Sequence, residues 1–187
     1  MQTIADIIKK RRSIYPHQYN DEKVSKEEIQ KLLEAANWAP THRKTEPWRY
    51  KVLQGKSKTK FSAFVGSLYL KSTDKPSKFK QRKIIDKFQQ SSAVIAICLQ
   101  RDPKESVPEW EEVAAVAMSV QNMWLLATEM QIGCYWSSPK MIKDFGEFFD
   151  FKEGEKCLGL LYLGKTDEEW PKGERQTSID EKIQFFD

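Results

Sequence analysis

Two spacings of apolar residues alternate along the chain. Spacings of three and four residues are typical of helices with one buried face. They predict five helices, which begin after Thr3, after Ser25, at Ser57, at Glu109 and at Pro139. In the first two, an acidic residue three positions after the cap (Asp6 and Glu28) completes the pattern of a capping box. We expect the second helix to end before Pro40 and the fourth to be ended by Gly133.

Four shorter runs have the character of strands. "WRYKVL" at 48–53 alternates, and "AVIAICL" at 93–99 is continuously apolar, which predicts a strand covered on both faces. The others are "CYWSS" at 134–138 and "CLGLLYLG" at 157–164. Helices and strands mix without regular βαβ alternation, and no repeat or linker divides the chain. The pattern predicts a single α+β domain over residues 1–187, with a central mixed or antiparallel sheet flanked by helices.

The composition is that of a globular protein, with 40% hydrophobic and 12% aromatic residues among 187. No apolar run approaches the roughly 20 residues of a membrane span, and the first residues lack the apolar region of a signal peptide. We therefore expect a cytoplasmic protein with no membrane association. Cys98, Cys134 and Cys157 form no C-x-x-C pair, and we interpret them as small hydrophobes.

The net charge is +4, and much of the excess lies in residues 71–88, which hold seven basic and two acidic residues. A run of this kind is usually a solvated helix face or a mobile loop. It can also attract an anionic partner, such as a dinucleotide or a nucleic acid. Phe79 and Phe88 do not make the regular aromatic platform on which bases stack, so we expect no nucleic-acid partner.

Two features suggest contact with another subunit. The helix expected at 109–131 is apolar nearly all round, which indicates a central helix or one in a subunit interface. The tail, residues 165–187, is polar and then closes in "KIQFFD". That apolar end either docks on its own domain or reaches a partner subunit, because a free terminus is normally frayed.

Several common catalytic motifs are missing from the sequence. It has no G-x-G-x-x-G or G-x-x-x-x-G-K-[ST] loop, no H-E-x-x-H and no G-x-S-x-G. Its two histidines and three cysteines are not at metal-ligand spacing, so we predict no metal site. If the protein is an enzyme, a bound organic cofactor is expected to carry the chemistry.

Three polar clusters remain, each at the boundary of an expected element. They are Arg11-Arg12-Ser13, the loop 41–45 between Pro40 and Pro47, and Trp136-Ser137-Ser138. Arginine and hydroxyl groups suit a phosphate, while an aromatic wall suits a flat heterocycle. In this order, with the long helix and the late "LGLLYLG", they resemble the FMN-dependent nitroreductase family. The resemblance covers nearly the whole chain and is to the short, single-domain branch.

The resemblance implies an obligate homodimer with FMN bound at the subunit interface. It also implies that NADH or NADPH reduces the flavin, which then reduces nitroaromatics, quinones or similar acceptors in a ping-pong cycle. No protein residue needs to act as a catalytic acid or base, because the flavin carries the redox chemistry. A flavin-binding protein without turnover, or a basic nucleic-acid-binding module, is the alternative.

The resemblance also assigns cofactor-binding roles. Arg11 and Ser13 are expected to hold the FMN phosphate and ribityl chain, with Arg12 alongside. From the other subunit, the flavin is expected to be approached by Thr41, His42 and Thr45. The residues expected along the flavin and phosphate are Trp136, Ser137 and Ser138. Members of the branch often carry a basic residue where this chain has Ser137, and Lys165 or Arg175 could replace that charge.

Each role has a purely structural alternative. Arginines are favoured at a helix C-terminus by the dipole. A loop histidine can cap nearby backbone, and Trp136 can be ordinary core.

Overall fold

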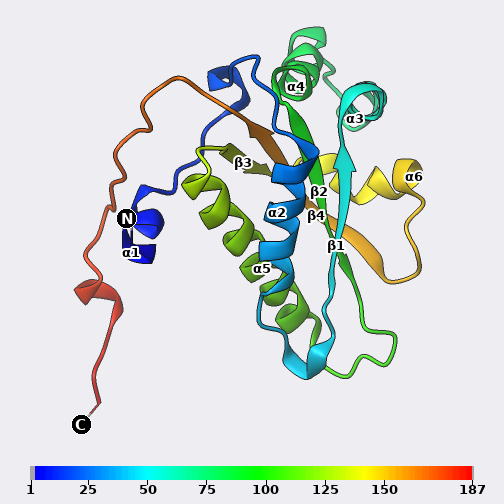
Figure 1. The fold of residues 1–187 in the computed structure, drawn as a ribbon. Helices are drawn as coiled ribbons and strands as arrows, with labels where there is room; N and C mark the ends of the chain where they lie inside the picture. Colours follow the sequence, from blue (N-terminus) through cyan, green and yellow to red (C-terminus); the bar gives the residue numbers. More distant parts are fainter. Residues whose placement is uncertain (1–2, 187) are drawn as a thin grey trace.

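The structure is a computed structural model and describes residues 3–186. Its centre is a four-stranded antiparallel sheet with strand order β1-β2-β4-β3 (Figure 1). The strands are β1 Trp48–Leu53, β2 Ala93–Gln100, β3 Gly133–Ser137 and β4 Glu155–Gly164. The α+β class is therefore confirmed, and the sheet is the antiparallel one of the two types expected. One parallel bridge, Ser13 to Cys134, adds the end of the first cluster to the β3 edge.

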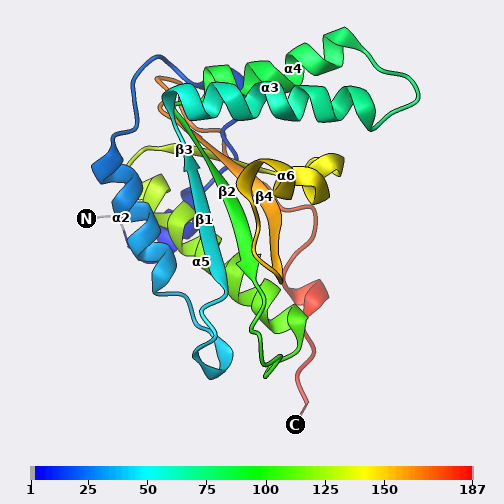
Figure 2. The same cartoon turned by 90° about the vertical axis from the view of Figure 1, so that its right-hand side faces the viewer.

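Helices cover both faces of the sheet (Figure 2). The α-helices are α1 Ile4–Lys10, α2 Lys26–Asn37, α3 Gly55–Lys71, α4 Lys78–Gln90, α5 Glu109–Glu129 and α6 Gly146–Phe149. Short 3₁₀ turns are η1 Pro16–Gln18, η2 His42–Lys44, η3 Lys140–Phe145 and η4 Asp180–Lys182. Helices α2 and α5 pack on one face, and α3, α4, η3 and α6 pack on the other.

Strand β2 shows why the sheet needs both layers. Its residues 93–99 are all buried. Ile95 and Ile97 belong to the core under α2 and α5, whereas Val94 and Cys98 belong to the core under α3 and α4. A strand whose alternate side chains enter two cores must be apolar throughout, as predicted from its sequence.

The two predicted capping boxes are present. Thr3 and Asp6 exchange hydrogen bonds at the start of α1, and Ser25 and Glu28 do the same at the start of α2. Each pair satisfies backbone N–H groups that the first helical turn leaves free. Local chemistry therefore sets both helix starts, and α2 ends before Pro40 as expected.

Three other boundaries differ from the prediction. Helix α3 begins at Gly55, and Ser57 is its third residue, where its hydroxyl accepts from the Gln54 N–H. Helix α5 ends at Glu129, and Gln131 takes the left-handed backbone with φ 56° that we had expected glycine to supply. Gly133 instead begins β3. Pro139 caps a 3₁₀ turn and is not the first residue of an α-helix.

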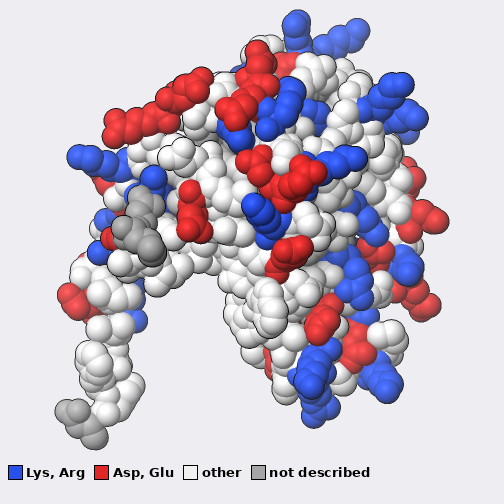
Figure 3. Space-filling view, in the orientation of Figure 1, with Lys and Arg blue, Asp and Glu red and all other residues white. Residues whose placement is uncertain are grey.

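The basic segment is largely helical. It forms the end of α3, a short connection and most of α4, and the α3–α4 hairpin projects beyond the sheet (Figure 2). Lysine and arginine side chains gather over it (Figure 3). The sequence pattern allowed a solvated helix face or a mobile loop, and the helix face is observed.

Helix α5 is only partly enclosed by its own chain. Its inner residues, including Val116, Val120 and Met123, are buried in the core. On its outer side Trp110 is 69% exposed and Met118 41% exposed. The outer side of α5 therefore leaves two large apolar side chains in solvent. Among residues 3–186, no helix is long and apolar enough to cross a membrane.

The tail runs past α1 and then away from the domain (Figure 1). Residues 171–186 are all exposed, with Phe185 at 84% and Phe186 at 85%. In this chain the apolar end therefore does not dock on its own domain, which was one of the two interpretations of its sequence.

Candidate functional site

The first and third polar clusters meet along one strand. After α1 ends, the Ile14 N–H donates to the Cys134 carbonyl at 3.0 Å, and Ser13 bridges to Cys134. Trp136 and Ser137 follow two and three residues later on the same strand, β3. Segments more than 120 positions apart in the sequence thus form one surface, as the resemblance requires.

Arg11 occupies a half-buried position on this surface. Its guanidinium carbon lies 4.9 Å from the centroid of the Trp124 ring, which projects from α5. Burial lowers the pKa of Arg11, and the positive charges of Arg12 and Arg175 lower it further. Within residues 3–186, no carboxylate forms an ion pair with it. A partly desolvated cation with cationic neighbours is suited to an anion such as phosphate.

Arg12 is committed to backbone groups. Its guanidinium donates to the carbonyls of Lys9 at 2.7 Å, Arg11 at 2.6 Å and Pro171 at 2.9 Å. A Cβ atom at Gly173 would overlap the same guanidinium. Arg12 therefore clamps the start of the tail, and few of its donors remain for a ligand.

The second cluster forms a tightly turned loop at the other end of the domain. The backbone torsion φ is positive at Arg43 (51°), Lys44 (55°) and Glu46 (43°). Residues other than glycine rarely adopt this conformation. The hydroxyls of Thr41 and Thr45 lie 3.1 Å apart, and Thr41 also accepts the Glu46 N–H at 3.2 Å. The two threonines therefore hold the loop's shape, and strain of this kind is concentrated at binding sites.

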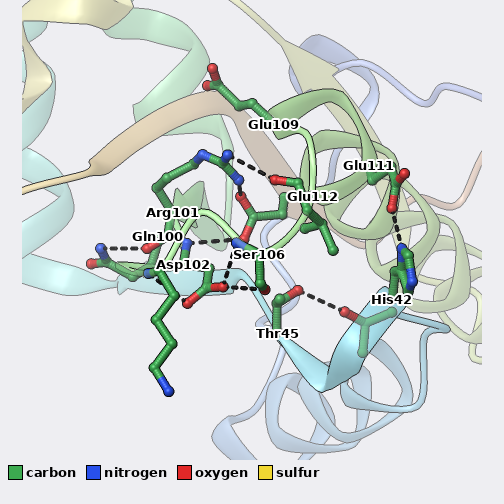
Figure 4. Close-up of polar contacts among 12 residues, drawn as sticks. His42, Thr45, Gln100, Arg101, Asp102, Ser106, Glu109, Glu111 and Glu112 are labelled. Atoms are coloured by element: carbon green, nitrogen blue, oxygen red, sulfur yellow. Dashed lines mark hydrogen bonds and ion pairs between the residues drawn. The ribbon is translucent and has the colours of Figure 1, made fainter.

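His42 projects from this loop toward α5. Its Nδ1 lies 2.5 Å from Oε2 of Glu111, while the imidazole stays 58% exposed (Figure 4). Both residues line a cavity of about 300 Å³, together with Thr41, Trp110 and Met118.

The loop and the Arg11 surface lie at opposite ends of α5. His42 contacts Glu111 in the first turn, and Arg11 contacts Trp124 near the last. Thirteen residues of α-helix separate these two contacts by about 20 Å. One chain therefore does not bring all three clusters to one place.

Trp136 lies across β4. It packs against the core under α2 and α5, and a methyl group at Gly159 would overlap its indole. The side chain is only partly buried, as is that of Ser137, whereas Ser138 is exposed. Trp136 is thus a core contact whose ring stays partly accessible, so the two interpretations of this residue are compatible.

Comparisons with known proteins identify the family to which the chain belongs. The sequence model of the Nitroreductase family matches residues 8–165. The chain belongs to this family. It is 28% identical over 183 residues to YfhC of Bacillus subtilis (strain 168), covering 96% of this chain and 92% of YfhC, whose NAD(P)H nitroreductase activity is itself assigned only provisionally.

Solved structures show the same fold. A nitroreductase-like family protein from Bacillus cereus has a TM-score of 0.88 and 30% identity, over 100% of this chain and 97% of that one. A nitroreductase with bound FMN from Bacteroides fragilis has a TM-score of 0.71 over 100% of both chains. At 17% identity, the second likeness shows the fold alone.

The two basic candidates near the C-terminus of this nitroreductase family member differ in placement. Lys165 Nζ lies 2.6 Å from Glu22 and 3.2 Å from Glu28, and these carboxylates raise its pKa. Arg175, in the tail, is close enough for its charge to lower the pKa of Arg11. Of the two, Arg175 is therefore the one whose charge reaches Arg11, whereas Lys165 is paired with two carboxylates.

Sequence reasoning did not identify Glu111 or Trp124. Glu111 stands among three acidic residues in the first turn of α5, where the helix dipole alone favours them. Trp124 lies in the long apolar helix, whose pattern indicates a central helix or one in a subunit interface and singles out no binding residue. Asn37, which sequence reasoning also left out, accepts the Trp48 indole N–H at 3.0 Å and so anchors the loop's strand.

Proposed function

We propose that this chain is an FMN-dependent oxidoreductase that acts as a homodimer with FMN between its subunits. NADH or NADPH is the electron donor, and nitroaromatics, quinones or related compounds are the acceptors. The proposal is supported by membership of the Nitroreductase family, by the provisional activity of YfhC, and by FMN in the Bacteroides fragilis structure.

One observation carries the two-subunit arrangement. The Arg11 surface and the His42 loop occupy opposite ends of α5, whose outer side exposes Trp110 and Met118. A twofold axis that pairs two copies of α5 antiparallel would place the loop of one subunit beside the Arg11 surface of the other. The same pairing would cover the exposed apolar side chains, and the extended tail is free to cross to the partner.

The residues present fit FMN. Arg11 and Arg175 would hold the phosphate, with hydroxyl donors from Ser13 and Ser138. Trp136 and Ser137 would line the ring system, and Thr45 and His42 would approach it from the partner's loop. When bound, FMN supplies the redox chemistry, so the chain's own groups bind it, orient it and exclude water.

Arg12 has a different role within the same proposal. Because it holds Pro171, it sets the direction in which the tail leaves the domain. That direction determines whether Arg175 comes near Arg11. It also determines whether Phe185 and Phe186 reach the partner subunit. Arg12 therefore supports the site through the tail more than through direct contact with the cofactor.

The test is reconstitution followed by steady-state kinetics. Apoprotein is titrated with FMN, and NADH and NADPH oxidation is then followed with a quinone and with a nitroaromatic. We expect saturable FMN binding and parallel double-reciprocal plots, the sign of a ping-pong cycle. Binding without turnover would indicate a flavin-binding protein of another function, and absence of FMN binding would overturn the proposal.

A further inference from the structure

The contact between His42 and Glu111 fixes the chemistry of the exposed imidazole nitrogen. The carboxylate oxygen lies 2.5 Å from Nδ1, at the end of the imidazole that faces α5 (Figure 4). A carboxylate only accepts hydrogen bonds, so Nδ1 must carry the proton when His42 is neutral. Nε2 is then left without a proton and is a hydrogen-bond acceptor.

His42 pairs with only one of the neighbouring glutamates. Three glutamates lie in the first turn of α5, and each has a different partner. Glu109 pairs with Lys156, whereas Glu112 pairs with Arg101 and Glu111 with His42 (Figure 4). The loop also offers Arg43 and Lys44 beside the histidine, yet neither forms an ion pair with Glu111 among the described residues.

The surroundings of the pair are those of a binding site. Glu111 is 23% exposed, much less than the histidine that it holds. The cavity beside them is bounded by Pro40, Trp110 and Met118, which give it an apolar wall. An oriented acceptor nitrogen beside an apolar, aromatic wall suits a flat heterocycle that carries an N–H group.

We propose that Glu111 is a positioning residue that fixes the Nδ1–H tautomer of His42, so that Nε2 accepts a hydrogen bond from a ring N–H of the flavin. The recognition step rests on the proposed function, because the flavin belongs to the partner's Arg11 surface. The oxidised isoalloxazine ring has one N–H group, at N3, and it lies between two carbonyl groups. Glu111 thereby favours ligands with this imide edge.

The tautomer is tested without any cofactor. ¹⁵N NMR of the imidazoles is recorded on the full-length apoprotein at about pH 8, above the ordinary pKa of histidine. His17 is the one other histidine in the sequence, and a His17→Asn variant assigns the signals. We expect Nδ1–H at His42 in wild type, in Glu111→Gln, whose amide oxygen can still accept, and in the control Glu109→Gln. In Glu111→Ala we expect a shift toward Nε2–H.

The recognition step is tested with a matched pair of ligands, FMN and N3-methyl-FMN. Wild type and Glu109→Gln should prefer FMN by roughly tenfold, because the methyl group removes one hydrogen bond and leaves Nε2 unpaired. In Glu111→Ala the preference should fall below about threefold. Glu111→Gln should keep most of it, since the tautomer is retained.

Two results would overturn the inference. One is a wild-type His42 that carries its proton on Nε2, or a tautomer unchanged in Glu111→Ala. The other is an equal preference for FMN over its N3-methyl analogue in wild type and Glu111→Ala. If wild type binds neither flavin, the proposed function and the recognition step fail together, while the NMR result still decides the role of Glu111.

Discussion

Arg11 lies over the indole of Trp124, with 4.9 Å between the guanidinium carbon and the ring centroid, and that indole donates its N–H to the Arg12 carbonyl at 3.1 Å. One tryptophan thus supports the side chain of one arginine and the backbone of the next. The stacking holds the Arg11 guanidinium half-buried, where an anion interacts with it more strongly than in open solvent.

Replacing Arg11 should weaken cofactor binding directly. Arg11→Ala is expected to reduce FMN affinity by about 1–3 kcal/mol, the range for a hydrogen bond to a charged group. The measurement is a fluorescence titration of apoprotein with FMN, and Lys9→Ala, at the exposed end of the same helix, is the control. Equal affinity in wild type and Arg11→Ala would remove this residue from the site.

Replacing Arg12 should act mainly on the tail. Arg12→Ala removes the hydrogen bond to the Pro171 carbonyl, so trypsin should cleave faster after Lys172 and Arg175, while FMN affinity falls less than in Arg11→Ala. Gly173→Ala, which forces a methyl group into the Arg12 guanidinium, should show the same increase. The clamp would be refuted by cleavage rates that match wild type in both variants.

Gly159 and Trp136 should be coupled. Gly159→Ala places a methyl group in the indole of Trp136 and is expected to destabilise the fold by about 1–3 kcal/mol, as overpacking commonly does. It should also weaken FMN binding by displacing the aromatic wall. Urea unfolding is the measurement, and Gly159→Ala combined with Trp136→Leu should recover part of the lost stability. Independent effects in this double-mutant cycle would contradict the contact.

Tyr50 should make the fold sensitive to alkaline pH. Burial raises the pKa of Tyr50 to about 12, against a smaller lowering by its hydrogen bond to Ser119. Tyrosine in the unfolded chain ionises near pH 10. The contribution of buried, neutral Tyr50 to the free energy of unfolding is therefore fully present below about pH 10 and is lost as pH rises toward about 12. Urea midpoints from about pH 9 to 11 should therefore fall less in Tyr50→Phe than in wild type. Equal falls would show that Tyr50 is not responsible.

Much of the fold could be predicted because its signals are local. Thr3 with Asp6, and Ser25 with Glu28, are capping pairs three residues apart, and the apolar run of β2 directly reflects burial on two faces. The end of α5 could not be located in the same way. Gln131 adopts the left-handed backbone usually taken by glycine, while Gly133, the glycine in the pattern, lies in a strand.

The candidate site was predictable as three clusters but not as a set of contacts. Arg11 and His42 stand out by residue type, whereas their partners Trp124 and Glu111 are 113 and 69 positions away and resemble ordinary helix residues. The choice between Lys165 and Arg175 also depends on tertiary structure. Lys165 pairs with two carboxylates, Glu22 and Glu28, that no local pattern connects to it.

The most direct measurement of the interface-bound cofactor is sedimentation of the FMN-loaded protein, followed at the visible absorbance of the flavin. Each chain has a mass of 21.9 kDa. We expect the flavin signal to sediment with a species of twice that mass, with one FMN per chain. Flavin that sediments with a single 21.9 kDa chain, or that does not sediment with the protein, would contradict a site built from two subunits.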